Sequence, residues 1–439
     1  TAMSLFSYCF GVLMCISLIG MPGYIHAQPR TDRLLRQLLF NNADSLFHHV
    51  ITHADTYRLQ ILYVQINRDA YNRPHFHTYA YHADPDAYFY PASTVKLPLA
   101  CLALEKLNEL HIPGVDKYTR MQIDSAYPWQ IPEWTDSTSE NGYPSIAHFI
   151  KKALLVSDND AYNRLYQFVG QQAIQEKLHA RGYRHVQIIR QFMGLTAEQN
   201  RYTNPIRFID ADGHVLYRQP ALYNPVPVSS GPPIWVGNAY MDREGKRVDH
   251  PMDFSMQNRI SLQDLLYMLR AILFPQSVPE KARFHLTADD YHFLYQYLSQ
   301  FPGETNYPRY DADVFYDTYV KFFFRDSSHH HLPPGVRVFN KVGWAYGFLT
   351  DASYVADFEH HVEYMLAATL YVNRDGILND DQYEYEEIGT PFFYRLGQII
   401  YQYELHRKRK HKPDLSRFQI PYEQRDTTDT RPTIKQVDN

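Results

Sequence analysis

The stretch Tyr90-Pro-Ala-Ser-Thr-Val-Lys96 and the residues that follow it decide how this chain folds. From Ser93 to Leu110, apolar residues recur at the spacing of one helix face, which predicts a helix over 93–110. Pro98 falls within the first turns, where proline is tolerated. A helix that begins at Ser93 places the Ser93 hydroxyl and the Lys96 amine on one face, one turn apart.

This pair of side chains suggests nucleophilic chemistry. A serine hydroxyl attacks a carbonyl only when a base removes its proton, and a lysine with a lowered pKa can be that base. The amides of a helix N-terminus also favour negative charge nearby. Ser93 and Lys96 are therefore a candidate nucleophile and base. The pattern Ser-x-x-Lys is common by chance, and a capping serine before a surface helix is the alternative.

Strand-like segments lie on both sides of this helix in the sequence. Alternating apolar residues predict strands over 58–68, 75–82, 336–340, 347–357 and 361–372, and a hairpin around Asp-Gly within 206–217. Helical spacing predicts helices over 146–155, 161–169, 174–180, 262–273, 289–298 and 391–405. This order predicts an α/β fold of the α+β kind, in which an antiparallel sheet, assembled from both ends of the chain, is flanked by helices and joined to an all-helical half.

Two further motifs contain candidate site residues. Ser157-Asp-Asn159 lies between two predicted helices, where it could cap a helix or could place Ser157 and Asn159 in a site. Lys341-Val-Gly343-Trp344 opens a late strand. A cation followed by a glycine there could let a substrate carboxylate lie against the backbone, and a strand-end lysine beside a bulge glycine is the alternative.

Together and in this order, the three motifs resemble the Ser-x-x-Lys, Ser-Asp-Asn and Lys-Thr-Gly set of class A β-lactamases and penicillin-binding proteins. The similarity covers most of 59–405. The resemblance implies that Ser93 is acylated, that Lys96 is the base and that Ser157 relays a proton. It also implies that Asn159 and Lys341 bind the substrate, that Gly343 lets the substrate approach, and that the backbone N–H groups of Ser93 and Trp344 form the oxyanion hole.

The chain departs from the family pattern at three places. Val342 stands where the family has Thr or Ser, which removes a hydroxyl from the expected substrate site. Long insertions near 203–256 and 275–334 separate the second motif from the third and could roof the cleft. The carboxylate that activates water for deacylation would fall at Met193 in a direct alignment, and Glu198 is the nearest candidate if the loop is longer.

The resemblance implies a serine hydrolase of the class A β-lactamase type, which acylates Ser93 with a β-lactam or a related amide or ester and then hydrolyses the acyl-enzyme. The alternatives are a D-Ala-type peptidase, penicillin-binding protein or esterase with slow β-lactam deacylation, and a sensor that binds β-lactams or cell-wall fragments. We expect no cofactor and no metal, because the histidine clusters at 75–77, 329–331 and 360–361 lack the ligand spacing of a zinc site.

Composition and the two ends of the chain limit the partners. The chain has 439 residues, 45% of them apolar, and a net charge of -5, which favours a large core and not a nucleic-acid partner. We expect a small-molecule or peptide substrate and no stable protein partner. The apolar run at 5–19 predicts a signal peptide over 1–27 and export to the periplasm or medium, with a membrane anchor as the alternative. The hydrolase domain is expected over 28–412, and a polar tail that frays over 413–439.

Overall fold

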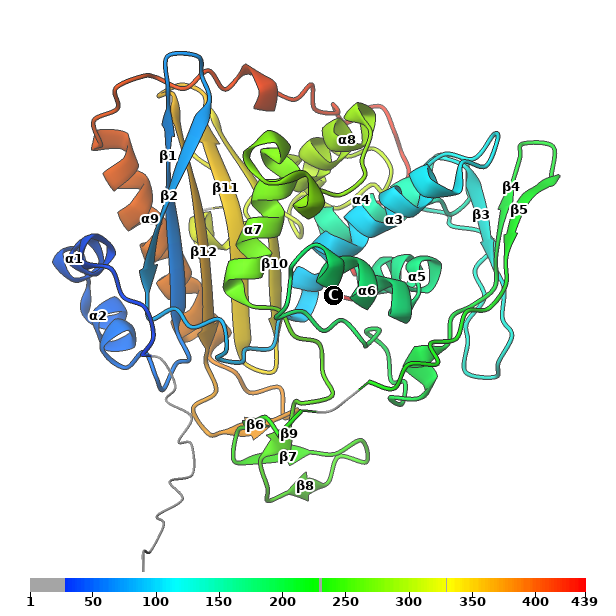
Figure 1. The fold of residues 1–439 in the computed structure, drawn as a ribbon, viewed down its shortest axis with the longest axis horizontal. Coiled ribbons are helices and arrows are strands. Elements are labelled where there is room, and N and C mark those ends of the chain that lie inside the picture. Colours follow the sequence, from blue (N-terminus) through cyan, green and yellow to red (C-terminus); the bar gives the residue numbers. More distant parts are fainter. Residues whose placement is uncertain (1–27, 229–230, 329) are drawn as a thin grey trace, which may run out of the picture.

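The structure, a computed structural model, describes residues 28–228, 231–328 and 330–439, so the expected signal peptide lies outside the described residues. Its centre is a five-stranded antiparallel sheet in the order β10-β11-β12-β1-β2 (Figure 1). The two ends of the chain meet where β1 pairs with β12, with Gln60 opposite Thr369. The strands are β1 (Gln60–Arg68), β2 (Pro74–Tyr81), β10 (Val336–Ala345), β11 (Phe348–Asp357) and β12 (Val362–Tyr371).

Helices cover both faces of this sheet (Figure 1). On one face, α1 (Arg33–Asn41), α2 (Ser45–Thr52) and α9 (Thr390–His406) share a core with the sheet. The other face packs against the helical half, which contains α3 (Lys96–Leu110), α4 (Ile146–Leu155), α5 (Asn159–Val169), α6 (Gln171–Ala180), α7 (Leu262–Leu273) and α8 (Ala288–Ser299). Every residue of β11 is buried because both of its faces are covered.

The predicted fold class is confirmed. The predicted helices are present, most of them within two residues of their expected ends, and the sheet is antiparallel and built from both ends of the chain. The first predicted helix is divided, since a 3-10 turn, η1 (Ala92–Val95), precedes α3. The helices α1 and α2 are additions that apolar periodicity did not predict.

Smaller sheets surround the core. The expected Asp-Gly hairpin is β4 (Ile206–Ile209) with β5 (Val215–Gln219), and it joins β3 (Arg120–Ile123) in a projecting sheet (Figure 1). Below the main sheet lie two small sheets (Figure 1). One pairs β6 (Trp235–Val236) with β9 (Met252–Asp253), and the other has the order β13 (Ile377–Leu378), β7 (Ala239–Met241), β8 (Arg247–Val248).

The expectation that the tail frays is wrong. Phe418 is buried and packs against Phe274 and Tyr354, with ring centroids 5.3 and 4.9 Å away. Further along, Ile434 pairs in parallel with Tyr310. The polar composition of 413–439 concealed these few apolar anchors, which hold the segment against the helical half.

Part of the basic run at 406–412, which begins at the end of α9, is paired with a buried carboxylate. Glu404 is fully buried, and its carboxylate accepts hydrogen bonds from Tyr63, Arg407 and Arg409. A buried carboxylate needs such partners because its desolvation is costly. Two of the basic residues therefore neutralise a charge in the core.

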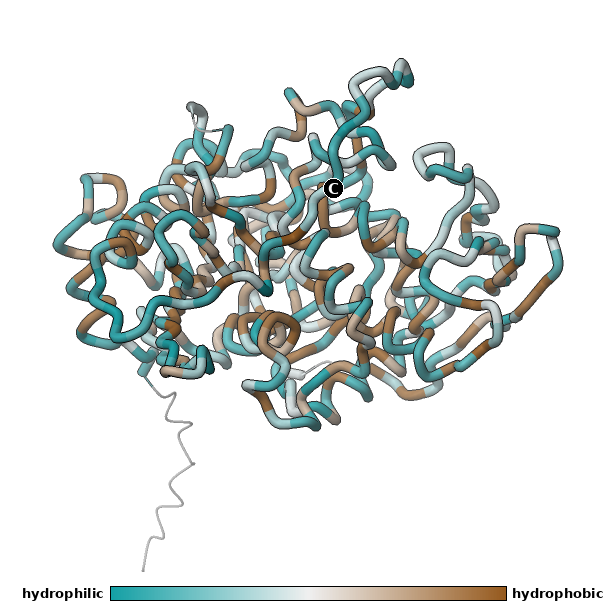
Figure 2. Tube along the Cα trace, turned by 90° about the horizontal axis from the view of Figure 1, so that it is seen from above, coloured by the Kyte–Doolittle hydropathy of each residue, from teal (hydrophilic) through white to brown (hydrophobic). Residues whose placement is uncertain are grey.

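None of the described helices combines the length and apolarity needed to cross a bilayer. Figure 2 shows hydrophobic and hydrophilic stretches alternating along the trace.

We predict that Gly397→Ala destabilises the protein although alanine favours a helix by about 1 kcal/mol over glycine. A Cβ added at Gly397 would overlap the Phe323 carbonyl, because α9 packs directly on η6 (Phe322–Phe324). We expect the free energy of unfolding in urea to fall by about 3 kcal/mol, as overpacking does. Gly194→Ala, where an added Cβ meets nothing within 4 Å, is the control, and equal stability of the two variants would contradict this packing.

Candidate active site

The turn η1 fixes the position of Ser93. Thr94 donates a hydrogen bond from its hydroxyl to the Pro91 carbonyl at 2.8 Å, which closes the turn before α3 begins. Ala92 has a φ of 45°, in the left-handed region that side chains other than glycine rarely adopt. The Ser93 side chain sits at the head of α3 with 8% of the residue exposed, and Lys96 follows one turn later, fully buried.

The Lys96 amine reaches the second motif. It donates hydrogen bonds to the Ser157 carbonyl, to Asn159 Oδ1 at 2.8 Å and to Ser157 Oγ at 3.3 Å. Burial lowers the pKa of Lys96 well below its usual value, and the nearby charge of Lys341 lowers it further. These two effects favour the neutral amine, whose lone pair becomes available when one of the three hydrogen bonds is released.

Ser157 stands between two lysines. Its Oγ accepts hydrogen bonds from Lys96 and, at 3.0 Å, from Lys341, and the residue is completely buried with a φ of 64°. The next residue of the motif, Asp158, caps a helix as the alternative interpretation expected. Its carboxylate accepts a hydrogen bond from the Ala161 N–H at the start of α5. The motif therefore both begins a helix and aims a hydroxyl at two amines.

Lys341 lies on β10 above a buried polar network. Burial lowers its pKa to about 7, an effect that the negative charge of Asp351 partly offsets. Asp351 accepts a hydrogen bond from the side chain of Asn340 at 3.0 Å, and Asn340 in turn accepts one from the Lys321 amine at 2.6 Å. Burial also lowers the pKa of Lys321 to about 7 and raises that of Asp351 to about 7.

Gly343 is where β10 touches the η1 turn. A Cβ at this position would lie 2.5 Å from the Pro91 carbonyl oxygen and 2.8 Å from the Ser93 nitrogen, so only glycine allows this approach. The Trp344 ring packs away from the turn, against Tyr319 and Phe322. Val342 is fully buried in the core on the α9 side, so its apolar side chain fills packed space.

The structure does not bring Glu198 to this group of residues. Its carboxylate bonds to Arg201 at 2.7 Å and accepts a hydrogen bond from the Tyr223 hydroxyl at 3.3 Å, and 56% of its side chain is exposed. The ring of Phe192, not a carboxylate, faces the Lys96 amine, with its centroid 5.2 Å away. Neither position 193 nor position 198 thus presents the expected base beside Lys96.

Several residues that surround the site belong to none of the three sequence motifs. Phe254, from the first insertion, packs its ring against Tyr90 and Tyr346, whose rings also contact each other near the η1 turn. Phe192 and Asp351 carry no motif that could have marked them. Lys321 gave one usable signal, since a lysine directly before three phenylalanines stands in a segment that must be buried.

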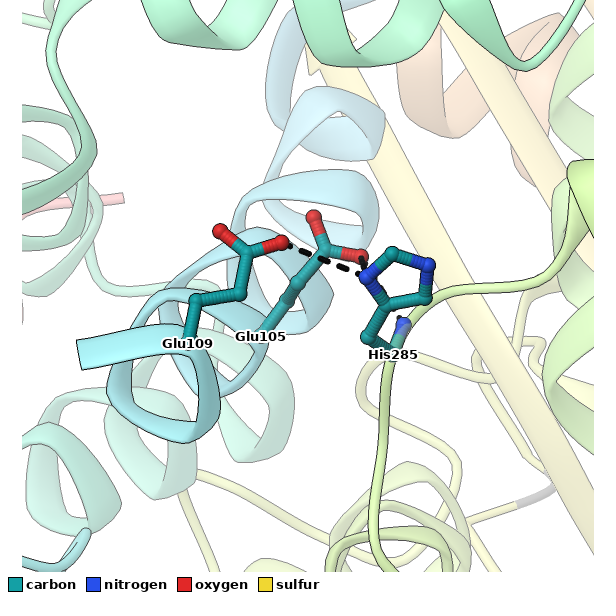
Figure 3. Close-up of side chains that lie close together, drawn as sticks. All are labelled: Glu105, Glu109 and His285. Carbon is teal, nitrogen blue, oxygen red and sulfur yellow. Dashed lines mark hydrogen bonds and ion pairs between the residues drawn. The ribbon is translucent and has the colours of Figure 1, made fainter. Parts of the chain in front are cut away.

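Potential metal ligands gather elsewhere. Glu105, Glu109 and His285 lie close together in Figure 3, but Glu105 is nine residues after Lys96, about 13 Å along α3. Lys177 already bonds both carboxylates, at 3.2 and 2.7 Å, and Arg181 bonds Glu105 as well. This cluster is a charge-compensated link between helices. The second such group in the described residues, Asp210, Asp212 and His214, lies on the β4–β5 turn.

Comparison with known proteins supports the resemblance. Residues 74–213, about a third of the chain, match the model of the β-lactamase enzyme family. This segment contains the first two motifs, and the match confirms the family resemblance. No curated protein sequence matches the chain.

The solved structures to which the chain is similar include three β-lactamases. The one from Burkholderia ambifaria is 14% identical, with 82% of this chain and 99% of that chain covered and a TM-score of 0.44. The one from Burkholderia phymatum is 12% identical, with 83% and 99% covered and a TM-score of 0.45. The one from Xanthomonas campestris pv. campestris is 13% identical, with 84% and 97% covered and a TM-score of 0.45. The family resemblance therefore rests on the sequence match.

We predict that Gly343→Ala slows the reaction of Ser93 with a serine-directed acylating reagent by about 100-fold, the usual effect of losing one oxyanion-hole donor. The added methyl would press on the Ser93 nitrogen and part β10 from the η1 turn. Stopped-flow acylation measures the rate, and circular dichroism checks that the fold is retained. A folded variant that reacts at the original rate would show that this close approach does not position the nucleophile.

Proposed function

Because residues 74–213 match the β-lactamase enzyme family, we propose that the protein is a serine hydrolase that forms an acyl-enzyme at Ser93 with a small or peptidic amide or ester, β-lactams included. The observation that carries the proposal is the convergence of Lys96 and Lys341 on Ser157 Oγ, next to the η1 turn. The expected signal peptide supports an exported, periplasmic or secreted location.

Acylation follows from the chemistry of these groups. Neutral Lys96 keeps two N–H groups for the Ser157 carbonyl and Asn159, and its lone pair takes the proton of the Ser93 hydroxyl. The Ser93 oxygen then forms a bond to the substrate carbonyl carbon, and the carbonyl electron pair moves to oxygen. When that pair returns, the C–N or C–O bond breaks, and Ser157 passes a proton, replaced from Lys96, to the leaving group.

Binding would come from the other motif residues. The backbone N–H groups of Ser93 and Trp344 would hold the developing oxyanion, and the side-chain amide of Asn159 would accept or donate to the substrate amide. Protonated Lys341 would attract a substrate carboxylate, as a charge-assisted hydrogen bond does.

Deacylation is the step that the site supports least. The Phe192 ring lies against the Lys96 amine, and Glu198, the expected base, is bound to Arg201 and Tyr223. A general base must come within hydrogen-bond reach of the attacking water. These contacts favour the alternative of a peptidase, penicillin-binding protein or esterase with slow β-lactam deacylation over a fast class A enzyme.

The decisive experiment is mass spectrometry of the protein after incubation with a penicillin and with an acylating ester. We expect one covalent adduct at Ser93, a burst of product followed by slow turnover, and no adduct in Ser93→Ala. An adduct that persists in Ser93→Ala would refute the proposed nucleophile.

Glu198→Gln serves as the matched variant for deacylation. Since both carboxylate oxygens of Glu198 are engaged away from Lys96, we expect the burst and the slow turnover to stay unchanged. Accumulation of acyl-enzyme in Glu198→Gln would instead identify Glu198 as the base.

A pH dependence follows from Lys341. Its pKa of about 7 means that the amine is charged below pH 7 and loses its charge as pH rises. We therefore expect kcat/KM for a carboxylate-bearing substrate, divided by that for its neutral ester, to fall about tenfold per pH unit above 7. Lys341→Ala should lower that ratio at pH 6 by about 30-fold, or about 2 kcal/mol.

Asp351→Asn tests the assignment of this ionisation. Its negative charge raises the pKa of Lys341, so the variant should move the inflection of the ratio to lower pH. A ratio that does not change with pH in the native protein would show that Lys341 serves the catalytic groups instead of the substrate carboxylate.

A further inference from the structure

We infer that residues 433–439, named here the C-terminal segment, bind the second motif as an internal peptide ligand and restrict the access of substrate to Asn159 and Ser93. The inference rests on the proposed function, because it concerns the same site. Figure 1 shows the chain passing from α9 across the top of the molecule towards the helical half and ending near α5.

One part of the segment is fixed to the second insertion. The Ile434 N–H donates a hydrogen bond to the Arg309 carbonyl at 2.8 Å, and the Asp311 N–H donates to the Ile434 carbonyl at 2.9 Å. The Thr433 hydroxyl adds a hydrogen bond to the Asp311 carboxylate at 2.8 Å. This short parallel pairing directs the following residues towards the second motif.

The other part of the segment contacts that motif on both sides of Ser157. The Asn159 N–H donates to the Asp438 carbonyl at 2.6 Å, and Asn159 Nδ2 lies 3.3 Å from the Asp438 carboxylate. Asn439 Nδ2 donates to the Val156 carbonyl at 3.0 Å and to the Tyr319 hydroxyl at 2.8 Å. The segment thus uses the amide of Asn159 that the proposed reaction assigns to the substrate.

The segment also acts through charge. The negative charge of Asp438 raises the pKa of Lys96, against the effect of burial. Lys96 must be neutral to take the proton of Ser93, so a nearby carboxylate opposes the reactive form. Occupation of Asn159 and stabilisation of protonated Lys96 both disfavour acylation while the segment is bound.

The segment is held by contacts that can be released. Lys435, Gln436, Asp438 and Asn439 are exposed, and only Ile434 and Val437 pack against the core. Hydrogen bonds of this kind each contribute on the order of 1 kcal/mol. A tethered ligand of modest affinity still occupies its site because its effective concentration reaches the millimolar range.

The test compares variants of the 439-residue chain. The double variant Asp438→Ala/Asn439→Ala removes the side-chain contacts with the second motif and the charge near Lys96, whereas Gln436→Ala changes an exposed residue of the same segment. We measure the second-order rate of Ser93 acylation by a small neutral ester. We expect the double variant to react at least about tenfold faster and Gln436→Ala to react at the native rate.

A binding measurement separates this inference from the proposed function. In a chain shortened after Pro432, with its melting temperature checked, a fluorescent peptide of residues 433–439 should bind, and the peptide with alanine at 438 and 439 should bind at least tenfold more weakly. The peptide should also slow acylation of the shortened chain.

Each outcome decides one of the two proposals. Equal acylation rates in the native and double-variant chains, or no binding of the native peptide, would overturn the inference. Slower reaction of the double variant would also overturn it, by showing that Asp438 assists the chemistry. Peptide binding to a protein whose Ser93 no reagent acylates would refute the proposed function and support the binding site alone.

Discussion

The site depends on the placement of two lysine amines around one buried hydroxyl. Lys96 and Lys341 both donate to Ser157 Oγ, and neither amine is exposed to solvent. Burial disfavours the charged forms of both amines, and the charge of Lys341 lowers the pKa of Lys96 further. A neutral lysine beside a serine is what nucleophilic activation requires.

This placement constrains three distant parts of the chain. The η1 turn supplies Ser93, the junction of α4 and α5 supplies Ser157, and β10 supplies Lys341. Left-handed φ values occur beside or within each of these parts, at Ala92, Ser157 and Tyr346. Residues in this region carry strain that only the surrounding packing can maintain, and such strain gathers at functional sites. The η1 turn follows β2 near the start of the chain, whereas β10 lies near its end. The sheet contains strands from both parts, and β10 packs against the η1 turn at Gly343.

The sequence predicts this site as far as its motifs are local. Spacing within a helix places Lys96 relative to Ser93, and apolar periodicity gives α4 and α7 at their observed bounds. The residues that surround the motifs come from distant parts of the chain. Sequence spacing predicts contacts within one element and does not predict contacts between distant elements. Phe192 over Lys96 and the pairing of Ile434 with Tyr310 are of this kind. The pairing of Arg407 and Arg409 with Glu404 is also of this kind, since the burial of Glu404 shows only in the packed structure.

The carboxylates around Lys96 connect access to the site with its reactivity. Asp158 and Asp438 both raise the pKa of Lys96, but Asp158 is committed to the N-terminus of α5 and cannot leave. Asp438 belongs to a segment held by few apolar contacts. When that segment withdraws, Asn159 becomes available and Lys96 loses one source of stabilisation for its charged form, so its pKa falls further. The inferred release of the segment would thus free Asn159 and favour the neutral form of Lys96, because both effects depend on the exposed residue Asp438.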